Sequence, residues 1–256
     1  MDFNFKDKTA IVTGASSGVG KEVSLLLCKY GCRVLAIGRN RNKLDNVLSE
    51  TEEYDGTLRS FECDLSVPIQ IESLFNELNK SNEKPDILIN NAAVFYRNNF
   101  EETTFDQYSE MIDVNLTSTF KLIKYVIPIM KSKKTGDILN ITSVAGCISP
   151  HGQTVYGATK ATLNHLTKGL AVELGPYGIR INALAPGPIN SPLWEKMYPD
   201  EIDRNKIFNM LKGKIPLGRI SEPKDIAYWC LKILDSDHNW MTGSIINLDG
   251  GRGLVG

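Results

Sequence analysis

Two residues four positions apart, Tyr156 and Lys160, carry side chains that can move a proton. On a helix this spacing places both side chains on one face. A tyrosine with its ordinary pKa of about 10 is a poor base at neutral pH, but a neighbouring ammonium group favours the phenolate. The pair therefore predicts a general acid/base that exchanges a proton with a substrate oxygen. Taken alone, the YxxxK spacing is also common in ordinary surface pairs.

A glycine-rich turn near the N-terminus follows an apolar strand and opens a helix. Its sequence, TGASSGVG, begins at Thr13. Glycines allow the backbone to turn sharply and approach a pyrophosphate, whose charge the first N–H groups of the helix can bind. The G-x3-G-x-G spacing differs from the more familiar G-x-G-x-x-G, and glycines also mark plain turns. The position directly after the first strand favours a dinucleotide site. Its expected contacts in this segment are Gly14, Ser16, Ser17, Gly18, Val19 and Gly20.

The end of the second expected strand indicates which dinucleotide binds. A carboxylate at this point accepts hydrogen bonds from the ribose diol and repels a 2′-phosphate, whereas an arginine pairs with that phosphate. Gly38 occupies the expected acidic position, Arg39 follows it, and Ser16 offers a further hydroxyl donor. The sequence therefore predicts NADP(H). Two alternatives stay open: Arg39 and Arg41 only solvate the start of the next helix, or Arg39 stacks on the adenine of either cofactor.

Together with further motifs, these segments resemble the single-domain type of the short-chain dehydrogenase/reductase family, nearly from end to end. Asn90–Asn91–Ala92–Ala93 resembles the NNAG segment of the family, and Ser143 precedes Tyr156 by thirteen residues, as the family's serine does. Asn115 stands where the family keeps an active-site asparagine. Pro186–Gly187 and the final LDGG segment match further landmarks. Two residues depart from the family pattern, Ala93 in place of glycine and Ser191 in place of a threonine.

This resemblance implies a catalytic tetrad of Asn115, Ser143, Tyr156 and Lys160 that interconverts a ketone and a secondary alcohol by hydride transfer. Ser143 would bond the substrate oxygen, and Asn115 would hold a water that links Lys160 to solvent. Lys160 would bond the nicotinamide ribose and, together with the positive ring of an oxidised nicotinamide, lower the pKa of the tyrosine. An N-cap role for Asp64 before the next helix is nearly as good an interpretation as a cofactor contact. The further cofactor contacts that we expect are Asp64, Leu65, Asn91, Ala92, Gly187 and Ile189.

The substrate is less defined than the chemistry. The family members with the most similar shape are 3-oxoacyl-acyl-carrier-protein reductases, and Lys131, Lys133 and Lys134 offer a basic surface for an acidic carrier. Those reductases often carry an arginine near the turn that here reads GPYG, from Gly175 to Gly178. A sugar, polyol, steroid or secondary-metabolite carbonyl is the alternative. A regulator that senses NADPH without turnover belongs to a different class, and the intact tetrad argues against it.

Strand-length apolar runs that alternate with helical segments must position these residues. Several runs are continuously apolar, which is typical of strands covered on both faces. The pattern predicts one doubly wound, Rossmann-type α/β domain over residues 1–256, with a parallel sheet between two layers of helices. Another strand is expected before Asp64. The apolar runs are 9–12, 33–37, 87–89, 137–141, 179–184 and 244–248.

Two long helices are expected over 105–133 and 154–174, the first kinked or shortened by Pro128. Their apolar positions exceed what one sheet face buries, which predicts a homotetramer or at least a homodimer. Residues 191–214 lie outside the strand and helix rhythm and combine bulky apolar residues with charges. This segment is predicted to be a helical lid over the sheet edge, whose apolar wall comprises Trp194, Met197, Phe208 and Leu211.

Composition excludes several other classes of function. Lys and Arg number 29 against 30 Asp and Glu, so no overall charge draws the chain to nucleic acid or to an anionic membrane. The five cysteines show no zinc spacing, and no metal site is expected. No apolar stretch reaches the length of a membrane span and no leader pattern is present, which predicts a cytoplasmic protein. His151, His165 and His238 receive no function.

Overall fold

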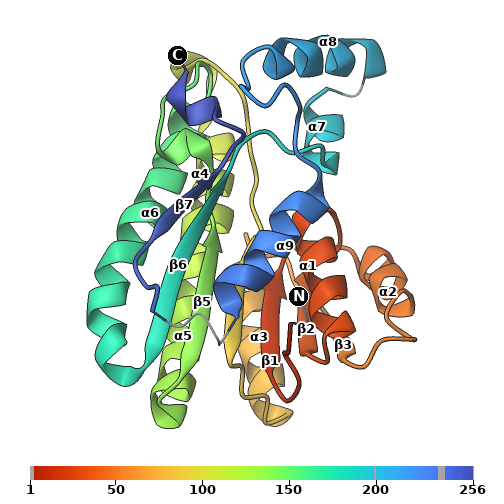
Figure 1. The fold of residues 1–256 in the computed structure, drawn as a ribbon, viewed down its shortest axis with the longest axis vertical. Coiled ribbons are helices and arrows are strands. Elements are labelled where there is room, and N and C mark those ends of the chain that lie inside the picture. Colours follow the sequence, from red (N-terminus) through yellow and green to blue (C-terminus); the bar gives the residue numbers. More distant parts are fainter. Residues whose placement is uncertain (1–2, 199, 236–239, 256) are drawn as a thin grey trace.

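A parallel sheet forms the centre of the computed structural model, which describes residues 3–198, 200–235 and 240–255 (Figure 1). Within these residues the sheet has seven strands in the order β3-β2-β1-β4-β5-β6-β7, and neighbouring strands run parallel. The order reverses between β1 and β4, where α/β sheets bind ligands beyond the carboxyl ends of their strands. The strands are β1 Thr9–Thr13, β2 Arg33–Gly38, β3 Thr57–Glu62, β4 Ile87–Asn90, β5 Gly136–Ile141, β6 Ile179–Pro186 and β7 Ile245–Leu248.

Helices cover both faces of the sheet, as expected for strands that are apolar on both sides. On one face lie α1 Gly18–Lys29, α2 Arg41–Ser49 and α9 Pro223–Leu234. On the other lie α3 Pro68–Lys80, α5 Ser118–Lys133 and α6 Thr154–Leu174.

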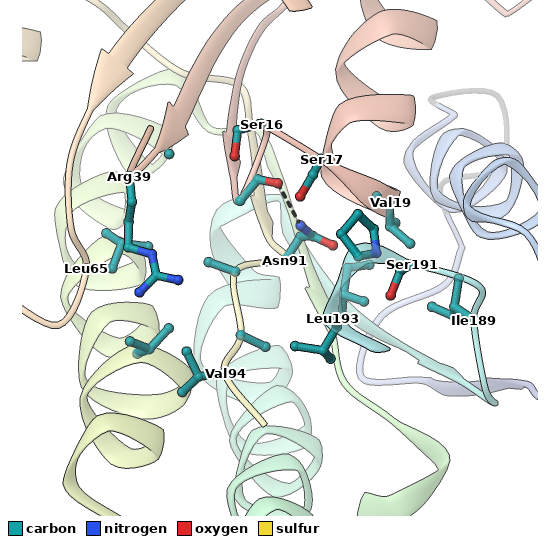
Figure 2. Close-up of a pocket in the computed structure, with 18 of the residues that line it drawn as sticks. Ser16, Ser17, Val19, Arg39, Leu65, Asn91, Val94, Ile189, Ser191 and Leu193 are labelled. Carbon is teal, nitrogen blue, oxygen red and sulfur yellow. Dashed lines mark hydrogen bonds between the residues drawn. The ribbon is translucent and has the colours of Figure 1, made fainter. Parts of the chain in front are cut away.

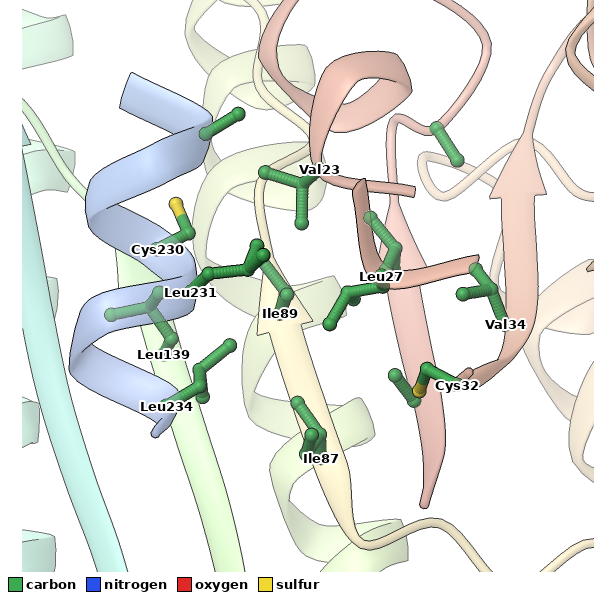
Figure 3. Close-up of a cluster of buried hydrophobic side chains, with 14 of the residues drawn as sticks. Val23, Leu27, Cys32, Val34, Ile87, Ile89, Leu139, Cys230, Leu231 and Leu234 are labelled. Carbon is green, nitrogen blue, oxygen red and sulfur yellow. The ribbon is translucent and has the colours of Figure 1, made fainter. Parts of the chain in front are cut away.

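Alternation along each strand divides the core into these two layers. In β1, Ala10 and Val12 face the layer of α1 and α9, whereas Ile11 faces the opposite layer. Figure 3 shows Leu27 of α1 and Leu231 of α9 meeting over Ile89 of β4. All four of these β1 and β4 side chains are fully buried. Val19 and Val23, near the start of α1, are buried in the same layer, so the first turn of α1 is held near the carboxyl end of β1, where the glycine-rich turn lies.

The six apolar runs coincide with strands to within two residues at each end. The largest difference is at the end of β6, which continues past the expected run 179–184 to Pro186. The expected strand before Asp64 is β3, which lies at the sheet edge and buries only part of its surface, so that no continuous apolar run marks it. The predicted doubly wound fold is confirmed.

The predicted helix over 105–133 differs in detail from the structure. It begins as α4, Phe105–Ile112, passes through one π-helical turn over Asp113–Thr117, and continues as α5 to Lys133. Pro128 therefore does not shorten it. Both Pro128 and Lys124, whose carbonyl loses its intrahelical partner to the proline, face solvent, so water can satisfy that carbonyl. The predicted helix over 154–174 is α6.

The described part of residues 191–214 is mostly helical, as predicted, and forms α7 Pro192–Met197 and α8 Glu201–Lys212 beyond the carboxyl end of β6 (Figure 1). Trp194 joins the pieces of this segment. Its indole N–H donates to the carbonyl of Ile189 at 2.8 Å, and its ring meets that of Phe208 edge-on with centroids 5.4 Å apart. The two short helices are thus fixed to the loop that follows β6.

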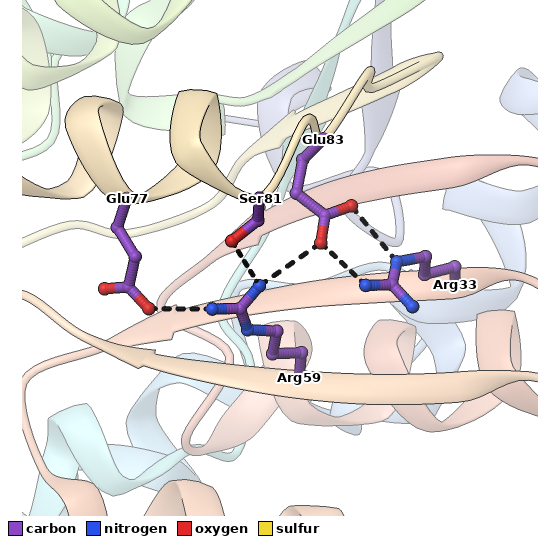
Figure 4. A network of polar contacts seen from close by, with 5 residues as sticks. All are labelled: Arg33, Arg59, Glu77, Ser81 and Glu83. Atoms are coloured by element: carbon purple, nitrogen blue, oxygen red, sulfur yellow. Dashed lines mark hydrogen bonds and ion pairs between the residues drawn. The ribbon is translucent and has the colours of Figure 1, made fainter.

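A network of ion pairs lies at the amino end of the sheet, opposite the end that carries the glycine-rich turn (Figure 4). The buried carboxylate of Glu83 lies 2.6 Å from Arg33 of β2 and 3.4 Å from Arg59 of β3. The hydrogen bond from Arg33 lowers the pKa of Glu83. Arg59 also pairs with Glu77 of α3 at 2.9 Å. This network ties β2, β3 and α3 together at a distance from the glycine-rich turn, so we assign it a structural role.

Candidate active site

One cavity of about 620 Å³ lies beyond the carboxyl ends of β1, β2, β4, β5 and β6 (Figure 2). Figure 2 shows Arg39 and Leu65 on one side of it, Ser191 and Leu193 on the other, and Asn91 between them. Two of the predicted site residues, Gly20 and Asn115, lie outside the lining. The predicted residues that line it are Gly14, Ser16, Ser17, Gly18, Val19, Arg39, Asp64, Leu65, Asn91, Ala92, Ser143, Tyr156, Lys160, Gly187 and Ile189.

The three glycines of the turn serve different purposes. Gly14 and Gly18 have φ angles of +65° and +54°, which residues with a Cβ rarely adopt. Gly20 is required by contact, because a Cβ there would lie 2.3 Å from the carbonyl oxygen of Gly14. The turn can therefore form only with glycine at these positions, which explains why Gly20 belongs to the motif without lining the cavity.

The start of α1 offers free hydrogen-bond donors to the cavity. Ser17 is the N-cap residue, yet its side chain makes no capping hydrogen bond, so the N–H groups of the first turn have no side-chain acceptor. Ser17, Gly18 and Val19 all line the cavity. Such N–H groups and the helix dipole bind phosphate groups. The turn therefore fits the pyrophosphate of a dinucleotide.

Thr13 connects the glycine turn to the segment after β4. Its hydroxyl accepts hydrogen bonds from the N–H groups of Asn91 at 2.9 Å and Ala92 at 3.0 Å, and the Asn91 amide donates to the Thr13 carbonyl at 2.9 Å. These contacts join the glycine-rich turn to the segment after β4, and both line the cavity. Sequence reasoning did not assign Thr13 this role, and only its place in the motif pointed to it.

Basic side chains define the adenosine end of the cavity. Arg39, Asn40 and Lys43 line it, and the side chain of Asn40 caps α2 by accepting from the N–H of Lys43 at 2.9 Å. A Cβ on Gly38 would lie 3.2 Å from the Ser16 hydroxyl oxygen, so a longer side chain would crowd the turn. Sequence reasoning missed Asn40 and Lys43, although both follow Arg39 closely.

Asp64 does not cap the next helix, so that interpretation was wrong. The N-cap residue of α3 is Val67, and the carboxylate of Asp64 instead accepts from the N–H and the hydroxyl of Ser66, at 2.9 and 2.7 Å. The resulting Asx turn presents Asp64 and Leu65 to the cavity.

Tyr156 lies at the inner end of the cavity beside Ser143. Burial raises the pKa of Tyr156 to about 12, while its hydrogen bond with Ser143 lowers that pKa. The ring of Phe95 lies 4.5 Å from the tyrosine ring, centroid to centroid, and shields it from water. Desolvation is the larger of these two influences on the phenol. The expected lowering of the pKa also depends on the positive ring of an oxidised nicotinamide and stays a prediction.

Lys160 is 2% exposed, and burial lowers its pKa to about 8. Its ammonium group donates to the carbonyl of Ile141 at 3.0 Å and lies 5.7 Å from the centroid of the Tyr156 ring. An ammonium group has three N–H donors. With one of them held by Ile141, the remaining donors can contact groups bound in the cavity, which Lys160 lines.

Asn115 lies in the π-helical turn between α4 and α5 and is 1% exposed. Its side chain exchanges two hydrogen bonds with the backbone of Val94, at 2.9 and 3.0 Å, and donates to the hydroxyl of Thr159 at 3.1 Å. Asn115 therefore holds the segment after β4 against α6, next to Lys160. Turns of this kind are common at functional sites.

A second cavity, of about 200 Å³, adjoins the first and shares Ser143 and Tyr156 with it. Trp194 and Leu211 of the predicted apolar wall line this cavity. Phe208 does not line it but packs edge-on against the ring of Trp194. Met210 lines it in place of the predicted Met197. Sequence reasoning also missed Phe95 and Leu193, because nothing in the sequence shows which loop residues converge on Tyr156.

His151 lines the second cavity and His165 is exposed on α6, while His238 lies outside the described residues. Among the residues that the structure describes, no group of three or more His, Cys, Asp or Glu side chains could hold a metal ion. In that same part of the chain, no helix has the length and hydropathy needed to cross a membrane.

Comparison with known proteins gives relatives over nearly the whole chain. The sequence profile described as enoyl-(acyl carrier protein) reductase matches residues 14–252. The 3-oxoacyl-[acyl-carrier-protein] reductase FabG of Thermotoga maritima is 32% identical over 95% of this chain and 97% of its own. The D-beta-hydroxybutyrate dehydrogenase of Rhizobium meliloti is 31% identical over 95% of this chain and 98% of its own.

Solved structures agree with these relatives. A short-chain type dehydrogenase/reductase from Mycobacterium marinum superimposes with a TM-score of 0.89 at 29% identity, covering 98% of this chain and 97% of its own. A protein assigned as an NAD(P)-dependent gluconate 5-dehydrogenase from Beutenbergia cavernae, with NADP bound at low occupancy, gives a TM-score of 0.90 at 26% identity, covering 98% and 99%. The chain therefore belongs to the short-chain dehydrogenase/reductase family of oxidoreductases, which act on alcohol and ketone groups.

Proposed function

We propose that this protein is an NADP(H)-dependent oxidoreductase that interconverts a ketone and a secondary alcohol, with Tyr156 as the general acid and base. The observation that carries the proposal is the position of Tyr156 and Ser143 in the wall shared by the two cavities. A carbonyl carbon in the smaller cavity would face a nicotinamide in the larger one. The bound cofactor supplies or accepts the hydride.

The side chains divide the proton chemistry between them. Because its pKa is about 12, the phenol of Tyr156 is protonated at neutral pH and can donate its proton to the carbonyl oxygen during reduction. The Ser143 hydroxyl, which also accepts from the N–H of Ala145 at 3.1 Å, would stabilise the charge that develops on that oxygen. In the direction of oxidation, Tyr156 must lose its proton first, and the ammonium group of Lys160 favours that loss.

Lys160 and Asn115 would support the tyrosine in different ways. The N–H donors of Lys160 that remain beside its bond to Ile141 would hold the hydroxyls of the nicotinamide ribose. Asn115 would hold a water that connects Lys160 with solvent. Its side-chain groups bond Val94 and Thr159, so its backbone carbonyl, in the π-helical turn, is the group that we propose for the water. That carbonyl also accepts from the hydroxyl of Thr119 at 3.1 Å, so a bound water would share it with Thr119.

The preference for NADP(H) rests on the adenosine end of the cavity. Arg39 and Lys43 line this end, and the position of a diol-binding carboxylate is taken by Gly38. The similar structure assigned as an NAD(P)-dependent gluconate 5-dehydrogenase holds NADP at low occupancy, which supports the same choice.

The substrate alternatives differ in support. The FabG relative favours a 3-oxoacyl thioester. However, an acyl carrier protein docked on Lys131, Lys133 and Lys134 would lie at the end of the sheet opposite Tyr156. These lysines end α5, which leads into the amino end of β5, whereas Tyr156 lies at the carboxyl ends. Lys133 also pairs with Asp86 at 2.6 Å. A small sugar, hydroxy acid or other secondary alcohol therefore has better support than a carrier-bound substrate.

A homotetramer or homodimer in the cytoplasm is the proposed state of the protein. Large apolar side chains remain exposed on three neighbouring helices, among them Phe105 of α4, Phe120 of α5 and Val172 of α6. Light scattering at micromolar concentration tests the assembly, and a monomer would refute it.

Turnover by Tyr156→Phe tests the proposed function. The variant is expected to lose carbonyl reduction across a ketone panel while its NADPH affinity stays within about threefold of wild type, because the phenol acts mainly in the transition state. Val155→Ala, on the same helix, serves as the control for packing. Substantial reduction by the Tyr156→Phe protein would exclude the assignment, and wild-type binding of NADPH without any turnover would support the regulator class instead.

A further inference from the structure

The smaller cavity next to Tyr156 is lined by positive charge without a matching carboxylate. Arg97, Lys214 and Arg252 line it, and His151 adds an imidazole. No Asp or Glu belongs to its lining as far as the described residues go. The three cations come from separate parts of the chain: the segment after β4, the turn after α8 and the turn after β7. Only the tertiary fold brings them together.

None of these three cations pairs with a carboxylate within the described ranges. Arg97 donates to the hydroxyl of Tyr198 at 3.3 Å, and Arg252 donates to the carbonyl of Val255 at 2.7 Å. Both partners are neutral, so neither compensates the charge. The nearest acid to Arg252 along the chain, Asp249, accepts from the N–H groups of Gly251 and Gly253, at 2.9 and 2.7 Å. Its negative charge is therefore already engaged by the backbone.

The position of Arg97 is fixed by its surroundings. A Cβ on Gly152, which has a φ of +73°, would lie 3.2 Å from the Cγ of Arg97, so the stem of the arginine packs closely on this turn. The N–H of the next residue, Asn98, donates to the carbonyl of Gly152 at 3.1 Å. The Gly152 turn directly precedes α6, which carries Tyr156, so the guanidinium and the phenol are tied to the same piece of structure.

Like charges that converge on one cavity repel each other, and an anion would relieve that repulsion. A guanidinium binds carboxylate and phosphate groups through paired, charge-assisted hydrogen bonds, each contributing more than a neutral one. The cavity volume of about 200 Å³ is below the range of about 300–1,000 Å³ that is usual for ligand sites, which favours a compact molecule over a steroid or a long acyl chain.

We infer that the substrate of this enzyme is a compact ketone, or the matching secondary alcohol, that carries a carboxylate or phosphate group held by Arg97 and Arg252. The inference rests on the proposed function, because it places the reacting carbon at Tyr156 and the anionic group at the far side of the same cavity. Lys214, which is exposed, adds attraction at the mouth of the cavity. Neutral sugars and steroids would leave these cations without a partner.

Matched pairs of substrates that differ only in charge test the inference. Reduction is measured, with NADPH and again with NADH, for acetoacetate and methyl acetoacetate, for 4-oxopentanoate and its methyl ester, and for dihydroxyacetone phosphate and dihydroxyacetone. We expect kcat/KM for the charged member of at least one pair to exceed that of the neutral member by about tenfold or more. The pair that responds identifies carboxylate or phosphate as the anionic group.

Variants locate the charge that is responsible. Arg97→Gln is expected to lower the ratio of kcat/KM between charged and neutral members by about tenfold, mainly through KM, and Arg97→Lys to recover part of it. Lys212→Gln removes an equal charge from exposed residue 212, outside the lining, and should leave the ratio unchanged. An equal fall in both members of a pair would indicate a structural effect of Arg97 and would overturn the inference.

The possible failures are distinguishable. Turnover of neutral ketones at rates equal to or above those of the charged members would overturn the anion site and leave the proposed function standing. Reduction of no compound would contradict the proposed function. In that case, calorimetric titration with succinate, which cannot be reduced, still decides on the anion site. Saturable binding that weakens about tenfold in Arg97→Gln would support it, and equal binding by both proteins would refute it.

Discussion

The carboxylate of Glu110 on α4 lies 3.6 Å from the guanidinium of Arg39, which follows β2. Its other oxygen accepts a hydrogen bond from the hydroxyl of Tyr96, and this bond, together with burial, raises the pKa of Tyr96 to about 12. Arg39 thus faces a protein carboxylate at the edge of the cavity where we place the 2′-phosphate. A bound phosphate would share the arginine with Glu110 and would also meet the negative charge of that residue.

Replacement of Arg39 by alanine is expected to remove most of the preference for NADPH. A hydrogen bond to a charged group contributes about 1.5–3 kcal/mol, so wild type should prefer NADPH over NADH by roughly ten- to a hundredfold in kcat/KM. Steady-state kinetics with each cofactor check this. Equal weakening of both cofactors in Arg39→Ala would mean that the arginine stacks on adenine, and equal use of both by wild type would overturn the cofactor assignment.

Neutralising Glu110 should act in the opposite direction. Glu110→Gln retains an amide oxygen for the Tyr96 hydroxyl but removes the charge near the phosphate, so KM for NADPH should fall by about three- to tenfold with little change for NADH. The change should shrink in high salt. Glu101→Gln, in the exposed turn before α4, is the matched control. A weaker affinity for NADPH would show instead that Glu110 serves mainly to position Arg39.

Lys160 should reduce the stability of the cofactor-free protein at neutral pH. Its pKa is about 8 in the folded chain against about 10.5 when exposed, so the unfolded chain binds the extra proton more readily. Lys160→Met is therefore expected to raise the free energy of unfolding by up to roughly 3 kcal/mol below pH 8, offset in part by the lost bond to Ile141. The gain should disappear as the pH approaches 10.5, while activity and cofactor affinity both fall.

Urea unfolding from pH 6.5 to 10.5 measures this effect. Lys168→Met, at an exposed position on the same helix, controls for the helix propensity and apolarity of methionine. A destabilised Lys160→Met protein at pH 7, or a gain that does not depend on pH, would contradict the prediction.

The segment over 191–214 is expected to close over bound ligands. Ser191, Pro192 and Leu193 line the larger cavity, and Leu211 and Lys214 line the smaller one, so ligands in both would contact the segment. Tryptic cleavage after Arg204, Lys206 and Lys212 should slow at least about fivefold with saturating NADP⁺ and an anionic substrate analogue. Cleavage after Lys80, which ends α3 and lines neither cavity, gives the reference rate. Equal rates with and without ligands would argue against a lid.

Local sequence was sufficient for most of the sheet and for the glycine-rich turn. Apolar runs predicted most strands because strands buried on both faces must be apolar throughout, and the glycine turn was visible because its φ angles and contacts exclude other residues. The spacing of Tyr156 and Lys160 sufficed because four residues on a helix always share a face. These features depend on neighbours along the chain.

Features that depend on residues far apart in sequence were decided only by the tertiary structure. Burial raises the pKa of Tyr156, and the sequence alone does not show this effect because desolvation reflects everything packed around the phenol. The same holds for Glu110 beside Arg39, and for Arg97 and Arg252 in one small cavity. The sequence by itself thus determined the fold and the reaction type, while the charge around the ligands was set where distant loops meet at the carboxyl ends of the strands.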